Sequence, residues 1–399
     1  VAHEVGHQFG ANHTFNNSCG GNRNDFTAVE PGSGNTIMAY AGICAPNTQN
    51  FSDDHFSGRS LQEIDVEILS AGHQCEALSG LGNNAPIILS TNANIAVPIN
   101  TPFALTAVAT DADGNTLTYN WEQMDNQIST QPPVATATGG PNFISNPSLT
   151  SPTRYFPNLV DLAAGGPFTW EVLPSVSRTM NFRVIVRDNA GGGGCNDHES
   201  VTLTTDANSG PFIVQYPSNT GITWNALTSE TVTWSVANTN LAPVNCTSVN
   251  IFLSIDGGQT YPHILATNTP NDGSELISVP NFGTTQARVM VIAANGTFFD
   301  ISNNNFTILQ AVNDYTLGAT PTSVSICQPD DAVYTINVGS IDNYSDNVSL
   351  TLSNVPAGAN ANLSSTNVIP GNTATLTISN TANVIPGTYV ITVNGNSTT

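Results

Sequence analysis

The sequence begins Val1-Ala2-His3-Glu4-Val5-Gly6-His7-Gln8-Phe9-Gly10-Ala11-Asn12-His13, and this stretch decides how the first part of the chain must fold. His3 and His7 are four residues apart, so on an α-helix both rings lie on one face and can reach one metal ion. Glu4 lies beside them, placed to take a proton from a metal-bound water rather than to bind the metal. Gly10 can adopt a positive φ, so the helix can end there and the turn can deliver His13 as a third ligand. Three imidazoles suit Zn²⁺ and leave its fourth position open, as in a catalytic site.

The extended pattern H-E-x-x-H-x-x-G-x-x-H, which runs from His3 to His13, resembles the signature of the metzincin zinc endopeptidases. Members of that clan carry a methionine turn after the histidines, and the segment 35–40 is the candidate here. The resemblance implies that Met38 forms an apolar floor beneath the metal. Two residues later stands Tyr40, as in astacins and serralysins, and it allows two interpretations. It is a switchable fifth ligand or oxyanion stabiliser, or it is an ordinary packed tyrosine.

The residues after the methionine turn resemble the end of a reprolysin-like catalytic domain (adamalysin type, M12B-like), and most of all that of bacterial secreted peptidases. The segment 51–54 leads into a helical pattern over 57–69, which we expect to pack under the metal site, and then into Cys75. Thr14 departs from the family, because reprolysins usually carry Asp directly after the third histidine. The resemblance implies that residues 1–80 form the C-terminal part of a metzincin domain.

The pattern starts at the third residue, so the expected helix lacks its first turns. In the clan, the sheet above the substrate cleft precedes this helix, and the sequence shows neither a signal peptide nor an apolar stretch of membrane-spanning length. We therefore expect a fragment or processed piece of a longer peptidase, inactive by itself although its parent is active.

The composition is typical of an acidic extracellular protein. Asp and Glu number 29 against 7 Lys and Arg, and the net charge of −22 argues against nucleic acid or an anionic membrane as a partner. Six cysteines fit an oxidising compartment, so we expect a secreted protein that acts on proteins or peptides. Cys19 and Cys44 flank the methionine turn, and we predict a disulfide between them. No pairs are assigned among Cys75, Cys195, Cys246 and Cys327.

From Pro86 onward, short alternating apolar runs separated by turn residues predict tandem all-β sandwiches. The first, over 83–207, resembles PKD, cadherin-like and fibronectin-like modules and contains a long insertion at 125–168 that we expect to be loop. Immunoglobulin- or fibronectin-like sandwiches are expected over 208–310 and over 311–399, the last one cut short. The predicted fold is thus multidomain: a truncated α+β metzincin domain followed by tandem immunoglobulin-like sandwiches.

Acidic loop residues predict a second metal site, in the first sandwich. Asp111, Asp113 and Asp188 have the oxygen-rich, glycine-spaced character of a Ca²⁺ site. D-x-D-G also builds a tight turn without metal, and both interpretations stand. His55 and His73 lie outside any ligand spacing and are expected at the surface. The sandwiches can bind extracellular protein or glycan, but core packing is expected for the four tryptophans, Trp121, Trp170, Trp224 and Trp234.

Two functions from different classes follow. The first, implied by the resemblance, is a secreted zinc-dependent metalloendopeptidase in which His3, His7 and His13 hold Zn²⁺ and Glu4 is the general base toward the zinc-bound water. The second is an extracellular adhesion or matrix-binding protein with an inert peptidase remnant, because about three quarters of the chain is predicted sandwich. The presence of all three histidines together with Glu4 favours the first.

Overall fold

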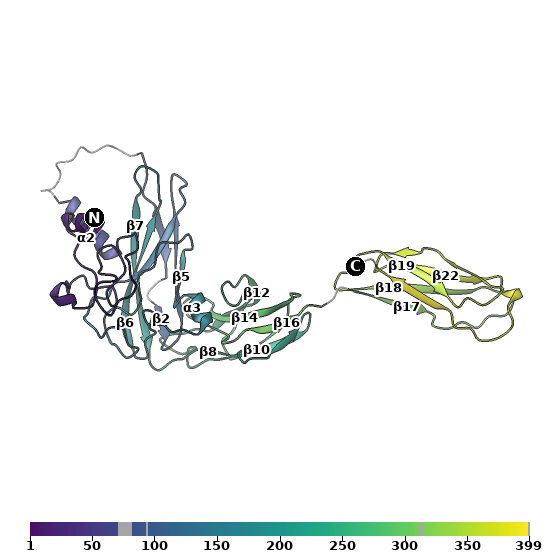
Figure 1. Ribbon diagram of the computed structural model, residues 1–399. Coiled ribbons are helices and arrows are strands. Elements are labelled where there is room, and N and C mark those ends of the chain that lie inside the picture. Colours follow the sequence, from purple (N-terminus) through teal and green to yellow (C-terminus); the bar gives the residue numbers. More distant parts are fainter. Residues whose placement is uncertain (71–81, 93–94, 312–313, 398–399) are drawn as a thin grey trace. The chain divides into compact units, whose positions relative to one another are not determined.

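The computed structural model describes residues 1–70, 82–92, 95–311 and 314–397. The chain divides into two compact units, Val1–Leu309 and Gln310–Thr399, each described by itself (Figure 1). Among the described residues, no helix has the length and apolar character needed to cross a membrane.

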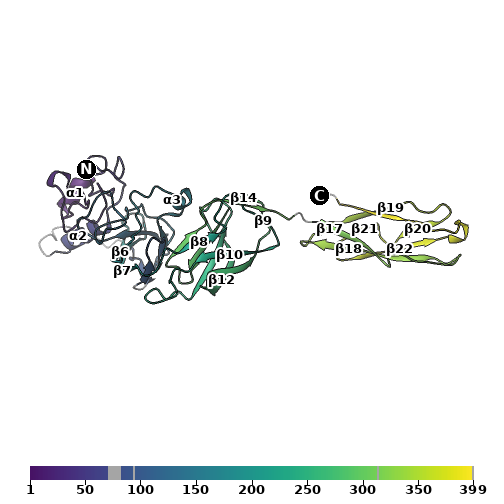
Figure 2. The same cartoon turned by 90° about the horizontal axis from the view of Figure 1, so that it is seen from below.

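The first 70 residues, called the N-terminal segment below, contain little regular structure. Their elements are α1 (Ala2–Gln8), a short 3-10 turn (Cys19–Gly21) and α2 (Gly58–Ile68). Helix α1 ends as expected, because Gly10 has φ +82° and turns the chain back. Helix α2 confirms the helix predicted over 57–69, and Ser57 caps it by accepting a hydrogen bond from the Ser60 amide. The helix α2 lies against strand β6 (Arg178–Arg187), as both views show (Figures 1 and 2).

The first sandwich forms from two sheets whose inner faces share an aromatic core. Alternation along β6 buries Met180, Phe182 and Val184. The rings of Phe103, Phe156 and Phe182 contact one another, with centroids 4.8–5.6 Å apart. The first sheet has the order β1-β3-β5, with β1 (Ile87–Thr91), β3 (Phe103–Thr110) and β5 (Thr153–Phe156). The second has the order β2-β7-β6-β4, with β2 (Ile95–Pro98), β7 (Asn196–Asp206) and β4 (Thr118–Gln123).

The insertion at 125–168 is more ordered than expected. It contains β5, which completes a sheet beside β3, and helix α3 (Leu159–Ala164), which Asn158 caps. Its first half follows an irregular path and binds the N-terminal segment, because Asn16 donates to the Gln127 carbonyl and accepts from the Ser129 amide. The loop expectation was therefore wrong for the second half of the insertion, where partners elsewhere in the fold satisfy the backbone.

The second sandwich shares a core with the first. Ala104 donates its amide to the Thr297 carbonyl at 3.0 Å, and one cluster combines Ala104 with Met290 and Phe299. One sheet has the order β13-β10-β8, with β13 (Ser274–Ser278), β10 (Ser229–Ser235) and β8 (Ile213–Tyr216). The other has the order β12-β11-β14-β16-β9, with β15 also paired to β14: β12 (His263–Pro270), β11 (Ser248–Ser254), β14 (Thr284–Ala293), β16 (Phe306–Leu309), β9 (Thr223–Asn225) and β15 (Phe299–Ile301).

The second unit is a further sandwich with its own core around Ile336, Val348, Leu350 and Leu376. One sheet has the order β17-β18-β22-β20, with β17 (Asp314–Thr320), β18 (Ala332–Ile341), β22 (Thr373–Ser379) and β20 (Asn360–Leu363). The other has the order β21-β19-β23, with β21 (Asn367–Val368), β19 (Val348–Ser353) and β23 (Thr392–Asn396). A 3-10 turn spans Thr381–Asn383. The predicted fold class, a short helical segment followed by tandem β-sandwiches, is confirmed.

The tryptophans behave largely as core residues. The exposed fractions of three of them are 2% or less, which confirms core packing for Trp121, Trp224 and Trp234. Trp170 is half-buried, and its ring lies against Gly32 in the N-terminal segment, where a Cβ would come within 2.6 Å of the ring. This tryptophan, which follows the insertion of the first sandwich, therefore joins that sandwich to the N-terminal segment.

Candidate metal centre

Three histidine rings converge at the end of α1. His3 and His7 lie on one face of the helix with their Nε2 atoms 3.2 Å apart, and the Nε2 of His13 lies 3.2 Å from that of His7. Within the part of the chain that the structure describes, this is the one group of three or more His, Cys, Asp or Glu side chains close enough to hold a metal ion. The structure thus brings together the three predicted ligands.

The other nitrogen of each ring fixes the tautomer. Each Nδ1 lies 2.6–2.8 Å from a backbone carbonyl, which can only accept a hydrogen bond, so each Nδ1 carries the proton. In this tautomer, Nε2 of each ring carries a lone pair that points toward the other two rings. The three acceptors are the carbonyls of Ile37 (for His3), Ala11 (for His7) and Asn22 (for His13).

This donor set fits zinc. Zn–N bonds of about 2.0–2.1 Å in a tetrahedral site place two ligand nitrogens about 3.3 Å apart. The observed separation between Nε2 atoms is 3.2 Å for two of the three pairs. Without a cation, three facing lone pairs repel one another, so the arrangement favours a shared positive ion. Three imidazoles leave one tetrahedral position for another ligand.

Burial and the neighbouring rings favour the neutral form of His13. Burial lowers the pKa of His13, and the neighbouring His7 and His3 rings lower it further, while the hydrogen bond to the Asn22 carbonyl and the charge of Glu4 raise it. The net effect is a pKa below the usual value, which favours the neutral ring that a metal requires.

Met38 lies beneath α1. Its side chain is fully buried, and a Cβ added to Gly6 would come within 2.4 Å of its sulfur and 3.0 Å of the Phe56 ring. Only a residue without a side chain fits between His3 and His7 at this point on the helix. Gly6 is a site residue that the sequence analysis missed, although a glycine inside a short helix is itself a signal for close packing.

A buried carboxylate shapes the methionine turn. The Oε2 atom of Glu30 accepts hydrogen bonds from the amides of Asn35 (2.8 Å) and Thr36 (3.0 Å), and Oε1 accepts one from the Thr36 hydroxyl at 2.5 Å. Burial raises the pKa of the Glu30 carboxyl, and these hydrogen bonds oppose that shift. Glu30 was not predicted, because nothing in its local sequence distinguishes it from a surface glutamate.

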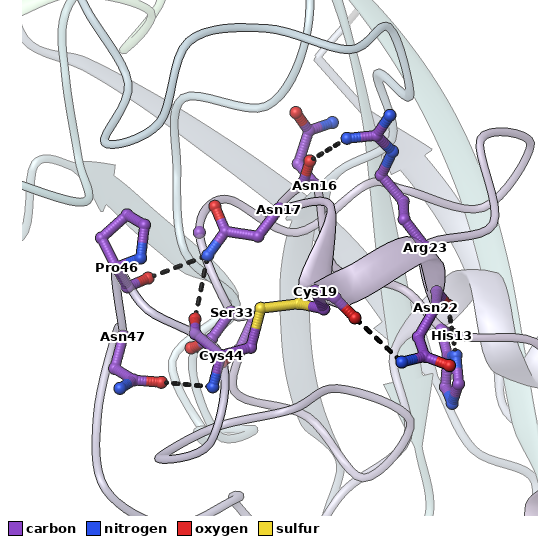
Figure 3. Close-up of a disulfide and its surroundings, with 12 residues drawn as sticks. His13, Asn16, Asn17, Cys19, Asn22, Arg23, Ser33, Cys44, Pro46 and Asn47 are labelled. Carbon is purple, nitrogen blue, oxygen red and sulfur yellow. Dashed lines mark hydrogen bonds between the residues drawn. A yellow bond between two sulfur atoms is a disulfide. The ribbon is translucent and has the colours of Figure 1, made fainter.

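Two further connections hold the loop that carries His13. The carboxylate of Glu63 in α2 accepts hydrogen bonds from the Asn12 amide at 2.9 Å and from the Asn12 side chain at 2.8 Å. The disulfide Cys19–Cys44 closes the loop, with a Cα–Cα distance of 5.4 Å (Figure 3). Asn22 links the disulfide to the His13 ring. Its side chain donates a hydrogen bond to the Cys19 carbonyl, and its own carbonyl accepts one from Nδ1 of His13.

Glu4 and Tyr40 flank the three rings. Glu4 is exposed in the first turn of α1, next to His3 in the sequence, and its charge acts on the His13 ring. The Tyr40 ring packs 4.6 Å from the His13 ring and 4.7 Å from the Phe15 ring, measured between centroids. Both interpretations of Tyr40 remain compatible with this half-buried position.

The three aspartates of the second predicted site are engaged with protein donors. Asp188 accepts from Asn83, Ala190 and Cys195, and although burial alone would raise its pKa, these hydrogen bonds hold it below the usual value. Oδ1 of Asp111 accepts from the Asp113 and Asn115 amides, and its Oδ2 is buried without a hydrogen-bond partner.

The remaining expectations have mixed outcomes. The side chain of His55 is only 10% exposed, so its expected surface position was wrong. Its Nε2 atom forms a hydrogen bond with the hydroxyl of Ser145 in the insertion. Cys195, Cys246 and Cys327 are free. Cys75 lies outside the described residues, as does His73.

Residues 1–71 match the family model described as metallo-peptidase family M12B, reprolysin-like, and this segment belongs to that family. None of the curated proteins matches the chain.

Similar solved structures include multi-sandwich proteins. The surface layer protein SbsC, domains 1–6, shares 13% identity over 86% of this chain and 56% of that chain, with a TM-score of 0.21. The N-terminal Ig1-2 module of the Drosophila receptor protein tyrosine phosphatase DLAR shares 12% identity over 57% and 100% of the two chains, with a TM-score of 0.30. The Escherichia coli adhesin FdeC shares 12% identity over 79% and 92%, with a TM-score of 0.19. This chain therefore spans about half the length of SbsC.

Proposed function

We propose that this chain carries the catalytic metal centre of a secreted zinc metalloendopeptidase. The observation that carries the proposal is the convergence of three Nε2 atoms, each backed by a carbonyl at Nδ1. The donor set and its spacing fit Zn²⁺ better than Ca²⁺ or Mg²⁺, which prefer oxygen ligands. The match of residues 1–71 to a metallopeptidase family supports peptide bonds of proteins as the substrate.

Bound to the three rings, zinc would polarise the scissile carbonyl and make a water molecule acidic enough to attack it at neutral pH. The Glu4 carboxylate would accept a proton from this water and pass it to the leaving amine, so one carboxylate would serve as base and then as acid. His3, His7 and His13 supply neutral nitrogen ligands and leave the fourth position open. Met38 closes the space beneath the rings and excludes water there.

The setting supports a role outside the cell. The Cys19–Cys44 disulfide is typical of proteins from oxidising compartments. A net charge of −22 favours solubility and disfavours binding to nucleic acid. The β-sandwiches that follow the metal centre would then serve as modules that bind extracellular protein or glycan.

The test compares zinc content and casein cleavage for the natural full-length protein and its Glu4→Ala variant. We expect one zinc per chain in both and loss of cleavage only in the variant, by at least about 100-fold. Glu199→Ala is the matched control, because Glu199 is an exposed glutamate of β7, far in sequence from the histidines. Zinc in both proteins without cleavage in either would support the alternative, an adhesion protein with an inert peptidase remnant. Cleavage that survives Glu4→Ala would contradict the assigned role of Glu4.

A further inference from the structure

A buried polar network joins the N-terminal segment to the first sandwich. Nε2 of His55 lies 2.9 Å from Oγ of Ser145 and 3.9 Å from Oε1 of Glu122. The Ser145 hydroxyl hydrogen-bonds the same Glu122 oxygen. Ser145 and Glu122 are each 4% exposed. His55 belongs to the N-terminal segment, Glu122 to β4 and Ser145 to the insertion, so the network crosses between parts of the fold.

The donors in this network can be assigned. Ser145 has one hydroxyl proton, which it donates to the Glu122 carboxylate, so Nε2 of His55 must donate to the Ser145 oxygen. The second oxygen of Glu122 accepts the Gly58 amide at 2.5 Å, at the first residue of α2. Gly58 lies so close to the sheet that a Cβ there would come within 2.7 Å of Ile185. One carboxylate of the sandwich thus binds the start of α2 directly and His55 through the Ser145 hydroxyl.

The network continues to the metal centre through the backbone. The Ile37 amide donates to the His55 carbonyl at 3.0 Å, and the Ile37 carbonyl accepts the Nδ1 proton of His3 at 2.7 Å. The Ser145 carbonyl also accepts the Asn35 side chain at 2.7 Å. Hydrogen bonds, linked by the covalent structure of His55 and Ile37, therefore connect Glu122 through Ser145 to His3, a predicted zinc ligand.

We propose that Glu122 and Ser145 are positioning residues of the metal centre, and that the first sandwich is a working part of it rather than a separable accessory module. The proposal rests on the proposed zinc site. Neither residue touches the metal or the substrate; both act through His55 on the peptide that orients His3. Groups that orient a metal ligand through hydrogen bonds set its direction and basicity, and small displacements of such ligands weaken binding.

The test uses the full chain and its Ser145→Ala and Glu122→Gln variants. Two properties are measured: the Zn²⁺ dissociation constant, by competition with a chromogenic chelator, and the visible absorption spectrum of bound Co²⁺, which reports ligand geometry. We expect affinity to fall about 10-fold in each variant, the effect typical of a lost outer partner, with a changed Co²⁺ spectrum. Ser145→Ala removes one hydroxyl and serves as the milder variant if Glu122→Gln fails to fold.

Asp125→Asn is the matched control. Asp125 is a buried carboxylate, 3% exposed, whose hydrogen-bond partners Gln123 and Asn181 belong to the sandwich alone. We expect it to lower the unfolding temperature but to keep the Zn²⁺ affinity within about twofold and the Co²⁺ spectrum unchanged. Equal loss of affinity in the control, or unchanged affinity in Ser145→Ala while the wild-type chain binds zinc, would overturn this proposal and leave the zinc site standing. A wild-type chain that binds no zinc would overturn both.

Discussion

The histidine cluster of the N-terminal segment and the aspartate loops of the first sandwich are both candidate metal sites, yet the fold treats them differently. At the histidines, backbone carbonyls occupy Nδ1 and leave all three Nε2 lone pairs facing one point. At the aspartates, backbone and asparagine N–H groups take up the carboxylate oxygens themselves, as Asn84 does for Asp113. Only Oδ2 of Asp111 lacks a donor among these three carboxylates in the described structure.

The difference shows that residue type alone does not define a metal site. A ligand must have its non-coordinating atoms satisfied by other partners, so that its coordinating atom is both free and aimed. The histidine cluster meets this condition. In the D-x-D-G turn, by contrast, backbone N–H groups of the turn itself hydrogen-bond the Asp111 carboxylate, and this stabilises the turn without a metal. Calcium binding there stays a prediction.

The largest expected effect is on zinc binding. His7→Ala removes the ring whose Nε2 lies 3.2 Å from both others, so zinc affinity should fall by more than the roughly 100-fold upper range for outer partners. Asp188→Asn, in the aspartate loops, should leave the zinc affinity unchanged. Isothermal titration with Zn²⁺ checks both variants. If Asp188→Asn weakened zinc binding as much as His7→Ala, the histidine cluster would not account for zinc binding by itself.

The next largest effect concerns the loop that presents His13. Replacing Cys19 and Cys44 together by Ser should lower the free energy of unfolding by about 3 kcal/mol, because the disulfide closes a loop with a sequence separation of 25. Denaturant unfolding measures this difference. Cys327→Ser is the control, since Cys327 is free and exposed, and its effect should stay within about 0.5 kcal/mol. Equal stability of the double variant and the wild type would show that the loop does not depend on the disulfide.

The two candidate sites should also differ in their response to pH. An ordinary imidazole takes up a proton near pH 6.5, so protons compete with zinc and its affinity should fall at least about 10-fold between pH 7.5 and 5.5. In the metal-free chain, the pKa of His13 is lowered on folding, so the unfolded state binds this proton first and stability falls as the pH falls below about 6.5. Zinc titration at both pH values provides the measurement. Affinity that does not change with pH would point to carboxylate ligands.

The smallest expected effect is that of calcium. With its one carboxylate oxygen that has no donor, the Asp111 loop should bind no more tightly than extracellular modules with dissociation constants of about 0.1–1 mM. Calcium at 1 mM should then stabilise the chain by no more than about 1.5 kcal/mol. Thermal unfolding with calcium and with EGTA, for wild type and Asp111→Asn, checks this limit. A much larger calcium-dependent rise in the unfolding temperature, lost in Asp111→Asn, would indicate that this loop is a metal site as well.

Local patterns in the sequence predicted much of the fold. The spacing of His3, His7, Gly10 and His13 was enough to place the three rings, because helix geometry and one turn determine it. Alternating apolar residues predicted the sandwiches for the same reason. The fused cores of the first two sandwiches were not predictable in this way, because the contact between Ala104 and Thr297 joins residues far apart in the sequence.

The supporting residues of the site escaped prediction for a related reason. Glu30 is a structural residue only because the chain folds around it, and no neighbour in the sequence marks it. His55 looked like a surface residue, since its partners Ser145 and Glu122 lie some 70 to 90 residues away. The predicted metal ligands follow a local motif, whereas the residues that hold their side chains in place depend on the whole fold.

The central claim is that His3, His7 and His13 bind one zinc ion through Nε2. X-ray absorption at the zinc edge, recorded on the full chain loaded with one equivalent of Zn²⁺, tests it most directly. We expect three nitrogen ligands at about 2.0–2.1 Å with the scattering pattern of imidazole, plus one oxygen. Sulfur ligands at about 2.3 Å, or a first shell made of oxygen alone, would contradict it.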